Sequence, residues 1–167
     1  MNRRHVLLGG LAALLTTRFG HAATVAADQA KRFIQAPVFW RKKVSDAAWD
    51  VLFQENTEPP FSSLLNDEKA VGTYLCAACY QPLFTSKAKF DSGTGWPSFF
   101  QALPKSIGQR EDRSFFMTRV EYHCVRCGGH QGHVFEDGPK PTGLRYCNNG
   151  LALRFVAQGK PLPALRG

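Results

Sequence analysis

Two short cysteine pairs constrain this sequence more than any other feature. The pairs have the form C-x-x-C and comprise Cys76 with Cys79 and Cys124 with Cys127. Each pair lets a tight turn aim two thiolates at one ion, so the two pairs together supply the four sulfurs of a closed tetrahedral zinc site. Residues 80–123 separate them, a longer stretch than the roughly 15–20 residues of a compact zinc ribbon. We therefore predict one structural zinc ion that joins two hairpins distant in the sequence.

Two other uses of paired cysteines stay open at this point. Cysteines of exported proteins often form disulfides, and a C-x-x-C motif can be redox-active. Gly128 and Gly129 follow the second pair directly, and they favour zinc because the backbone of a metal knuckle must turn sharply. A closed four-sulfur site has no open position for a substrate, so the chemistry must lie elsewhere.

The first 23 residues have the three-part layout of an export signal. Arg3 and Arg4 precede an apolar run from Val6 to Leu15, and small residues follow at Gly20 to Ala23. The run is too short to span a bilayer, and the paired arginines resemble a twin-arginine signal. We expect cleavage and export to the periplasm or beyond, with no stable membrane association afterwards. An amphipathic N-terminal helix is the alternative, and Gly9–Gly10 counts against it.

The charge pattern gives no indication of nucleic-acid binding. The chain carries a formal net charge of +8, and Arg3, Arg4 and Arg18 leave with the signal. The remaining basic residues are scattered and form no stripe. After the signal at 1–23, we expect a linker at 24–39, one folded domain at 40–157 and a loose tail at 158–167.

The domain begins with a helical pattern and continues with strand patterns. Ser45 suits a helix N-cap, helix-spaced apolar residues follow as far as Leu52, and Pro59–Pro60 ends the pattern. From Gly72 onward, short runs rich in Val, Phe, Tyr and Thr are broken by Gly, Pro, Asn and Asp. Several short strands separated by turn signals predict a mostly β, antiparallel domain with a short N-terminal helix.

A fifth cysteine, Cys147 in the segment GLRYCNNG, lies outside both pairs. In an extended segment, residues two apart share a face, so Arg145, Cys147 and Asn149 point the same way. A guanidinium beside a thiol favours the thiolate and lowers the pKa of the thiol. The amide of Asn149 can hold a water or a polar substrate atom. The alternative interpretation is structural, with Cys147 as a small buried apolar residue and Asn149–Gly150 as a hairpin turn.

Two more motifs carry residues suited to chemistry. His130 and His133 lie between glycines in GHQGHVFED, and two free imidazoles near an activated thiolate can donate hydrogen bonds or protons. As zinc ligands beside the second cysteine pair they would crowd four ligands into residues 124–133, far tighter than usual spacings. Trp96 sits between a glycine and a proline, where a tryptophan forms either the wall of an apolar site or a plug in the core.

Together these segments resemble a known family. NTEPPF, YLCAACYQPLF, FDSGTGWPSFF, CVRCGGHQGHVFEDGPKPTGLRYCNN and LRF occur in the order and spacing of the methionine sulfoxide reductase B family, from about Lys43 to Phe155. The resemblance implies two antiparallel sheets held by a zinc site of four cysteines. It also implies an oxidoreductase of protein repair and the oxidative stress response, which reduces the R epimer of methionine sulfoxide, chiefly within proteins.

The resemblance also implies roles for individual residues. By the matching RYC motif, Cys147 looks like the nucleophile that attacks the sulfoxide sulfur, which leaves methionine and a cysteine sulfenic acid. By their place in GHQGHVF, His130 and His133 resemble the residues that bind or protonate the sulfoxide oxygen, with His133 as the expected acid, and Arg145 would support the thiolate. The other residues carried over are Asn149 as a catalytic amide, Trp96, Phe135 and Asp137 as substrate contacts, and Cys76, Cys79, Cys124 and Cys127 as zinc ligands.

The sequence departs from the family pattern at two positions. Thr94 stands where many members have a resolving cysteine, and Gly150 stands where serine is common. The chain has five cysteines, and none remains after four bind zinc and one attacks. We therefore expect a monomer whose partners are oxidised proteins and an external reductant, such as a thioredoxin-like protein or another thiol. The competing hypotheses are a binding module with an inert Cys147 and a disulfide oxidoreductase that uses its C-x-x-C pairs and binds little zinc.

Overall fold

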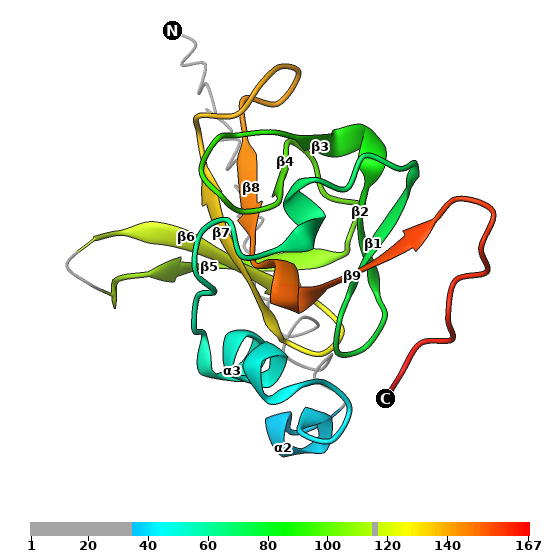
Figure 1. The fold of residues 1–167 in the computed structure, drawn as a ribbon. Coiled ribbons are helices and arrows are strands. Elements are labelled where there is room, and N and C mark those ends of the chain that lie inside the picture. Colours follow the sequence, from blue (N-terminus) through cyan, green and yellow to red (C-terminus); the bar gives the residue numbers. More distant parts are fainter. Residues whose placement is uncertain (1–34, 115–116) are drawn as a thin grey trace, which may run out of the picture.

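The computed structural model describes residues 35–114 and 117–167 (Figure 1). The predicted export signal and most of the predicted linker lie outside the described residues. The first helix of the described residues is the short α2 (Pro37–Trp40), which starts slightly before the expected domain boundary at residue 40. None of the helices in the described part of the chain is both long and apolar enough to cross a membrane.

Helix α3 (Asp46–Gln54) forms where the sequence predicts it. The Ser45 side chain accepts a hydrogen bond from the Ala48 amide at 3.2 Å, which confirms the predicted N-cap. The helix ends when Glu55 adopts a left-handed conformation, and its buried face carries Ala48, Val51 and Leu52. This face packs against strand β7 (His130–Phe135) and the short helix η4 (Gly150–Ala152), so α3 covers one end of the sheet that carries the site.

The strands form two antiparallel sheets, as predicted. The three-stranded sheet has the order β2-β1-β9, and the six-stranded sheet has the order β3-β4-β8-β7-β6-β5. The first contains β1 (Gly72–Cys76), β2 (Pro82–Thr85) and β9 (Leu153–Ala157). The second contains β3 (Lys89–Phe90), β4 (Ser98–Phe99), β5 (Ile107–Asp112), β6 (Arg119–Cys124), β7 (His130–Phe135) and β8 (Arg145–Asn148). Within residues 35–114 and 117–167, the 3-10 turns η1 (Leu64–Asn66), η2 (Ser86–Ala88) and η4 (Gly150–Ala152) lie in the connections.

Buried aromatic rings join the two sheets. Phe84 of β2 stacks on Phe99 of β4 with ring centroids 4.2 Å apart, and Tyr74 of β1 meets the same ring edge-on at 4.9 Å. Tyr122 of β6 and Tyr146 of β8 extend the cluster with a T-shaped contact at 5.4 Å. Such offset and edge-to-face pairs add to the free energy gained from burying large apolar surfaces. The core therefore lies directly behind β8, the strand that carries Cys147.

The C-terminal segment differs from the loose tail that we expected. The Arg166 amide donates a hydrogen bond to the Cys79 carbonyl at 3.0 Å, and the Arg166 guanidinium lies 3.9 Å from the centre of the Tyr80 ring. The same guanidinium donates to the Lys43 carbonyl at 2.7 Å, while Arg126 donates to the Arg166 carbonyl at 3.3 Å. The end of the chain thus packs against the first cysteine knuckle, because arginine finds a ring and carbonyl acceptors there.

Candidate functional site

The four paired cysteines converge on one point inside the protein. The sulfur atoms of Cys76 and Cys127 lie 3.6 Å apart, those of Cys79 and Cys124 lie 3.5 Å apart, and all four lie within 4.8 Å of one another. A disulfide requires about 2.05 Å between sulfurs, whereas four sulfurs each about 2.3 Å from a shared zinc ion lie roughly 3.8 Å apart. All four residues are buried, so this arrangement fits a closed, structural metal site.

The two cysteine turns have the same backbone geometry. The amides of Tyr80 and Gly128, each directly after its pair, donate to the carbonyls of Cys76 and Cys124 at 2.9 Å. Both residues have left-handed backbone angles, with φ of 63° at Tyr80 and 73° at Gly128. Glycine adopts such angles without steric cost, whereas Tyr80 adopts them with strain. The sharp turn predicted after the second pair is therefore present, and the first pair makes the same turn with Tyr80 in place of a glycine.

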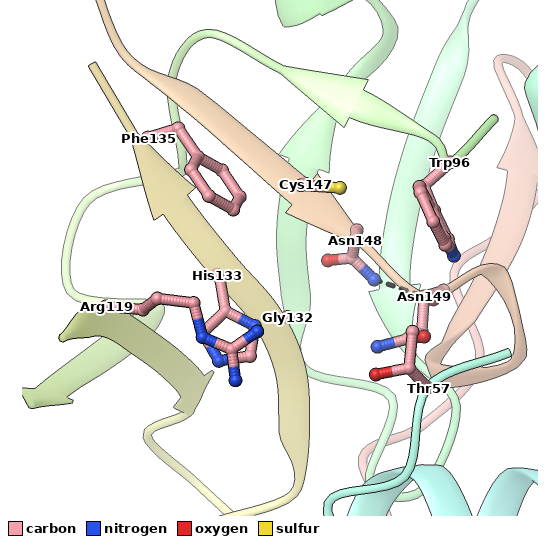
Figure 2. Close-up of a pocket in the computed structure, with 9 residues that line it drawn as sticks. All are labelled: Thr57, Trp96, Arg119, Gly132, His133, Phe135, Cys147, Asn148 and Asn149. Carbon is pink, nitrogen blue, oxygen red and sulfur yellow. Dashed lines mark hydrogen bonds between the residues drawn. The ribbon is translucent and has the colours of Figure 1, made fainter. Parts of the chain in front are cut away.

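The fifth cysteine lies apart from the metal site, in a pocket of about 130 Å³ (Figure 2). In the sheet, Cys147 pairs with His133 of β7 on one side and with Ser98 of β4 on the other. Trp96 and Phe135 lie on either side of Cys147 in Figure 2. The pocket is lined by Thr57, Trp96, Arg119, Gly132, His133, Phe135, Cys147, Asn148 and Asn149.

The pocket contains only part of the predicted site. It brings together the expected nucleophile and acid, Cys147 and His133, with both expected aromatic walls and Asn149. His130, Arg145 and Asp137 are absent from its lining. These three residues lie behind or beside the pocket and contact the residues that form it, as described next.

Asp137 contacts Arg145 in the structure. The carboxylate of Asp137 receives two hydrogen bonds from the Arg145 guanidinium, from Nε at 2.7 Å and from Nη2 at 2.8 Å. The guanidinium carbon also lies 4.3 Å from the centre of the Phe135 ring. A bidentate pair of this kind fixes the plane of the arginine, so Asp137 positions Arg145, and Arg145 supports the pocket wall at Phe135.

The environment of the Cys147 thiol differs from the expected one. Burial raises the pKa of Cys147, and the positive charge of Arg145 and a hydrogen bond with Thr94 oppose this shift without cancelling it. The expectation that Arg145 lowers the pKa is correct for its own contribution and wrong for the net shift. Cys147 is therefore mainly a protonated thiol at neutral pH in the free protein, so attack requires a proton acceptor nearby.

A small chain of hydroxyl groups lies beside Cys147. The Ser92 hydroxyl is 2.8 Å from those of both Thr94 and Ser98. Ser98 is the strand partner of Cys147, and Thr94 reaches the thiol itself. The position where many family members have a second cysteine thus carries a hydroxyl that contacts the nucleophile.

His133 is held by a carboxylate that the sequence did not reveal. Its Nε2 lies 2.8 Å from the Asp112 carboxylate, which also accepts a hydrogen bond from Arg119 at 2.7 Å. Hydrogen bonds from Ser114, and then from His133, hold the pKa of Asp112 well below its usual range. Because Asp112 stays ionised, we assign the proton of neutral His133 to Nε2, which leaves Nδ1 as an acceptor. Burial lowers the pKa of His133, although the hydrogen bond to Asp112 opposes the shift. The ring is therefore neutral at neutral pH, and its Nδ1 is free to accept a proton from a neighbour.

His130 lies behind His133 and is almost completely buried. Its Nδ1 is 2.8 Å from Glu121, its Nε2 has no hydrogen-bond partner, and its ring meets the His133 ring edge-on at 5.5 Å. Burial would raise the pKa of Glu121, but hydrogen bonds from His123 and His130 lower it to about 2. A shift in strand register between Tyr122 and His123 breaks the alternation of side chains along β7. This irregularity allows two histidines three residues apart to meet.

Asn149 has a structural role that differs from the expected one. Its side-chain oxygen accepts from the Glu58 amide at 3.0 Å, and its side-chain nitrogen donates to the Gln131 carbonyl at 3.1 Å. The Glu58 carbonyl accepts from the Trp96 indole at 3.0 Å. The amide of Asn149 therefore ties the loop before β1 to β7, and this loop in turn fixes the ring of Trp96.

Two glycines of the site are required by close contacts. A Cβ atom at Gly132 would overlap the carbonyl oxygen of Cys147, so only glycine lets β7 approach β8 at the nucleophile. A Cβ atom at Gly150 would overlap the hydroxyl of Ser63. Gly150, the second departure from the family pattern, thus allows the segment around Ser63 to pack against η4.

Comparison with known proteins places this chain in a family. Residues 44–157 match the SelR domain family. The chain belongs to the SelR domain family. Three similar proteins, each named peptide methionine sulfoxide reductase MsrB, come from Methanosarcina barkeri, Saccharophagus degradans and Herminiimonas arsenicoxydans. Their identities to this chain are 52% over 120 residues, 48% over 122 residues and 48% over 128 residues.

The alignments cover most of the SelR proteins involved. They include 71%, 72% and 76% of this chain, and 84%, 91% and 93% of the three relatives, respectively. The family resemblance inferred from the motifs is therefore confirmed. Among solved structures, the Mis18 "Yippee-like" domain covers 54% of this SelR chain at a TM-score of 0.44 and 20% identity, a likeness too distant to bear on function.

Proposed function

We propose that this protein is a peptide-methionine (R)-S-oxide reductase, which reduces methionine R-sulfoxide, chiefly in proteins, to methionine. The observation that carries the proposal is one thiol, Cys147, outside the metal cluster and inside a pocket with an aromatic residue on each side and His133 as its strand partner. The similar proteins named MsrB support the same reaction, since this chain spans most of their length.

The pocket suits the end of a methionine sulfoxide side chain. Trp96 and Phe135 offer apolar faces to a methyl group, and His133 and Arg119 lie on the polar side, where the sulfoxide oxygen carries partial negative charge. A small cavity with mostly apolar walls and a few polar groups is typical of a site that orients one small functional group.

The chemical step begins with deprotonation of Cys147. Nδ1 of neutral His133 takes the thiol proton, and the thiolate attacks the sulfoxide sulfur. The imidazolium formed then returns the proton to the sulfoxide oxygen, with Asp112 stabilising its charge at Nε2. The oxygen ends on Cys147 as a sulfenic acid, the substrate sulfur gains two electrons, and methionine leaves.

An external thiol completes the cycle in this proposal. Four of the five cysteines form the metal cluster, and Thr94 replaces a resolving cysteine. One thiol condenses with the sulfenic acid to give a mixed disulfide and water, and a second thiol reduces that disulfide to regenerate Cys147. A thioredoxin-like protein or another thiol compound can supply both equivalents.

We infer that the four-cysteine cluster holds zinc. Zinc bound by four thiolates has no open position, so it would stabilise the fold and take no part in the reaction. We also propose that residues 1–23 direct export by the twin-arginine route, which carries folded proteins. Transport of the folded domain would allow the metal to bind before the cysteines meet an oxidising compartment.

The test compares the protein with Cys147→Ser on a peptide that contains either the R or the S epimer of methionine sulfoxide. Dithiothreitol serves as reductant, and bound zinc is measured in the same samples. We expect wild-type turnover of the R epimer only, and no turnover by the variant, which should retain its zinc. Inactivity of both proteins with zinc bound would favour a binding module, and inactivity with little or no bound zinc would favour a disulfide oxidoreductase.

A further inference from the structure

We propose that three exposed apolar side chains beside the pocket bind apolar residues that flank the sulfoxide in a substrate polypeptide. These side chains belong to Phe61, Leu64 and Leu151 and are called the apolar rim below. The proposal rests on the proposed function and deepens it, because it names the preferred substrate as methionine sulfoxide within an apolar sequence.

The rim residues are exposed to an unusual extent for their type. The exposed fractions are 73% for Phe61, 90% for Leu64 and 37% for Leu151. A single exposed leucine is ordinary in a soluble protein, but apolar side chains that gather at the mouth of a pocket often mark a binding surface. The question is therefore whether the three residues are connected to one another and to the pocket.

Hydrogen bonds attach Phe61 to the loop that carries Trp96. The Phe61 amide donates to the Gly95 carbonyl at 2.7 Å, and the Asn66 side chain donates to the same oxygen at 2.9 Å. A Cβ atom on Gly95 would collide with Phe61, so the two backbones touch. Thr57, a few residues earlier, lines the pocket itself. The segment from 57 to 66 therefore runs from the pocket to the rim along one side of Trp96.

Leu64 and Leu151 lie on two short helical turns that pack together. Leu64 begins η1, Leu151 lies in η4, and these two turns are in contact. The carboxylate of Glu58 accepts a hydrogen bond from the Leu151 amide at 2.9 Å. Since η4 directly follows the pocket residue Asn149, the chain leads from the pocket to Leu151 and to the turn that packs against η1, where Leu64 lies.

The backbone conformation of Phe61 indicates a functional role for this residue. Its φ of 62° is left-handed, a conformation that is unfavourable for a bulky residue. Burial does not offset this strain, because most of the side chain is exposed. Strain of this kind is typical of functional sites, and here the strained residue donates its backbone hydrogen bond to Gly95, directly before Trp96.

Continuity with the pocket determines the occupant. The pocket accepts one small side-chain end, and the rim begins where that side chain would leave the pocket and join its main chain. The occupant is therefore a polypeptide in extended form, with its sulfoxide in the pocket and its neighbouring apolar side chains on the rim.

The experiment uses two blocked pentapeptides with a central methionine R-sulfoxide, flanked on both sides either by leucine or by serine. We expect wild-type kcat/KM to be about tenfold higher for the leucine peptide, mainly through KM, which corresponds to about 1.4 kcal/mol of buried apolar surface. Leu64→Ser and Phe61→Asn should bring the ratio close to one; asparagine tolerates a left-handed backbone. Val38→Ser, at a residue of α2 that is 75% exposed, should keep the tenfold ratio.

Other outcomes overturn the proposal in distinguishable ways. Equal wild-type kcat/KM for both peptides means that the rim does not select substrates. If the rim variants have a kcat/KM that is lower by the same factor for both peptides, the rim has a structural role. If light scattering shows that the wild type is a dimer and the rim variants are monomers, the rim is a self-association surface. No wild-type turnover of either peptide, or of N-acetylmethionine R-sulfoxide, means that the proposed function itself has failed.

Discussion

Asp112 and His133 form a hydrogen-bonded pair across two strands, with the Asp112 carboxylate 2.8 Å from Nε2 of His133. The two residues lie on β5 and β7, which are separated in the sheet by β6. Asp112 does not line the pocket, so it acts on the reaction through the two lining residues that it contacts, His133 and Arg119. This relationship determines which nitrogen of the expected acid carries a proton, and it leads to the first prediction.

Asp112→Asn should lower kcat by about 100-fold, at the lower end of what general acid catalysis contributes. The hydrogen bond that His133 donates to Asp112 raises the pKa of His133, so its loss should lower that pKa further. Only the neutral ring can take the thiol proton, so the acidic limb of the pH–kcat profile should move to lower pH. Glu111→Gln, a change at the neighbouring exposed carboxylate, is the control. A variant with reduced kcat and an unchanged profile would contradict the assigned role.

Arg145→Gln should raise the pKa of Cys147, because the charge of Arg145 opposes the effect of burial. The measurement is the rate of Cys147 alkylation by iodoacetamide as a function of pH, followed by mass spectrometry. The titration midpoint should lie above the ordinary thiol value in the wild type and higher still in the variant. Arg145→Lys should fall between them, since it keeps the charge and loses the bidentate contact with Asp137. A midpoint that does not move would show that Arg145 only supports Phe135.

Thr94→Cys should create a resolving cysteine. Thr94 contacts the Cys147 thiol, so a thiol at this position can attack the sulfenic acid and form an intramolecular disulfide. After one turnover without reductant, the variant should lose two hydrogens in mass and show no reactive thiol at Cys147. Thr118→Cys, a change at an exposed residue of another segment, should leave Cys147 as a sulfenic acid.

Loss of the metal should destabilise the whole domain. The cluster joins the end of β1 to the end of β6, and binding of structural zinc contributes directly to folding free energy. Cys79→Ser, or chelation under mildly denaturing conditions, should lower the thermal midpoint substantially. Cys147→Ser should leave both the midpoint and the zinc content close to wild type. If Cys79→Ser melted at the wild-type temperature, the cluster would not be a structural metal site.

Arg166→Ala should lower the free energy of unfolding by about 1–2 kcal/mol. The change removes a cation–π contact with Tyr80 and a hydrogen bond to the Lys43 carbonyl, each worth on the order of 1 kcal/mol. Denaturant unfolding measures the difference. Lys160→Ala, at an exposed residue earlier in the same segment, is the matched control and should stay within about 0.5 kcal/mol of wild type.

Several features of the fold and site could be predicted from local sequence. The cysteine spacings predicted the four-sulfur cluster, Ser45 and the following apolar residues predicted α3, and the short strand patterns predicted a mostly β, antiparallel domain. The division into two sheets came from the family resemblance. Each of these signals arises from residues close together in the chain, or from ligand chemistry that admits few solutions. The motif around Cys147 likewise singled out the thiol that lines the pocket, although it gave the wrong net direction for its pKa.

The other features depended on tertiary structure. The register of strands β5 to β8 brings Asp112 next to His133. The packing of the segment before β1 provides hydrogen-bond partners for the Asn149 amide and leaves Phe61 exposed. The pKa of Cys147 follows from burial between strands distant in sequence, which a local motif cannot encode. The sequence by itself therefore determined which residues are capable of the chemistry. The tertiary structure decided which of them meet and how much water surrounds them, because long-range pairing and burial depend on the whole chain.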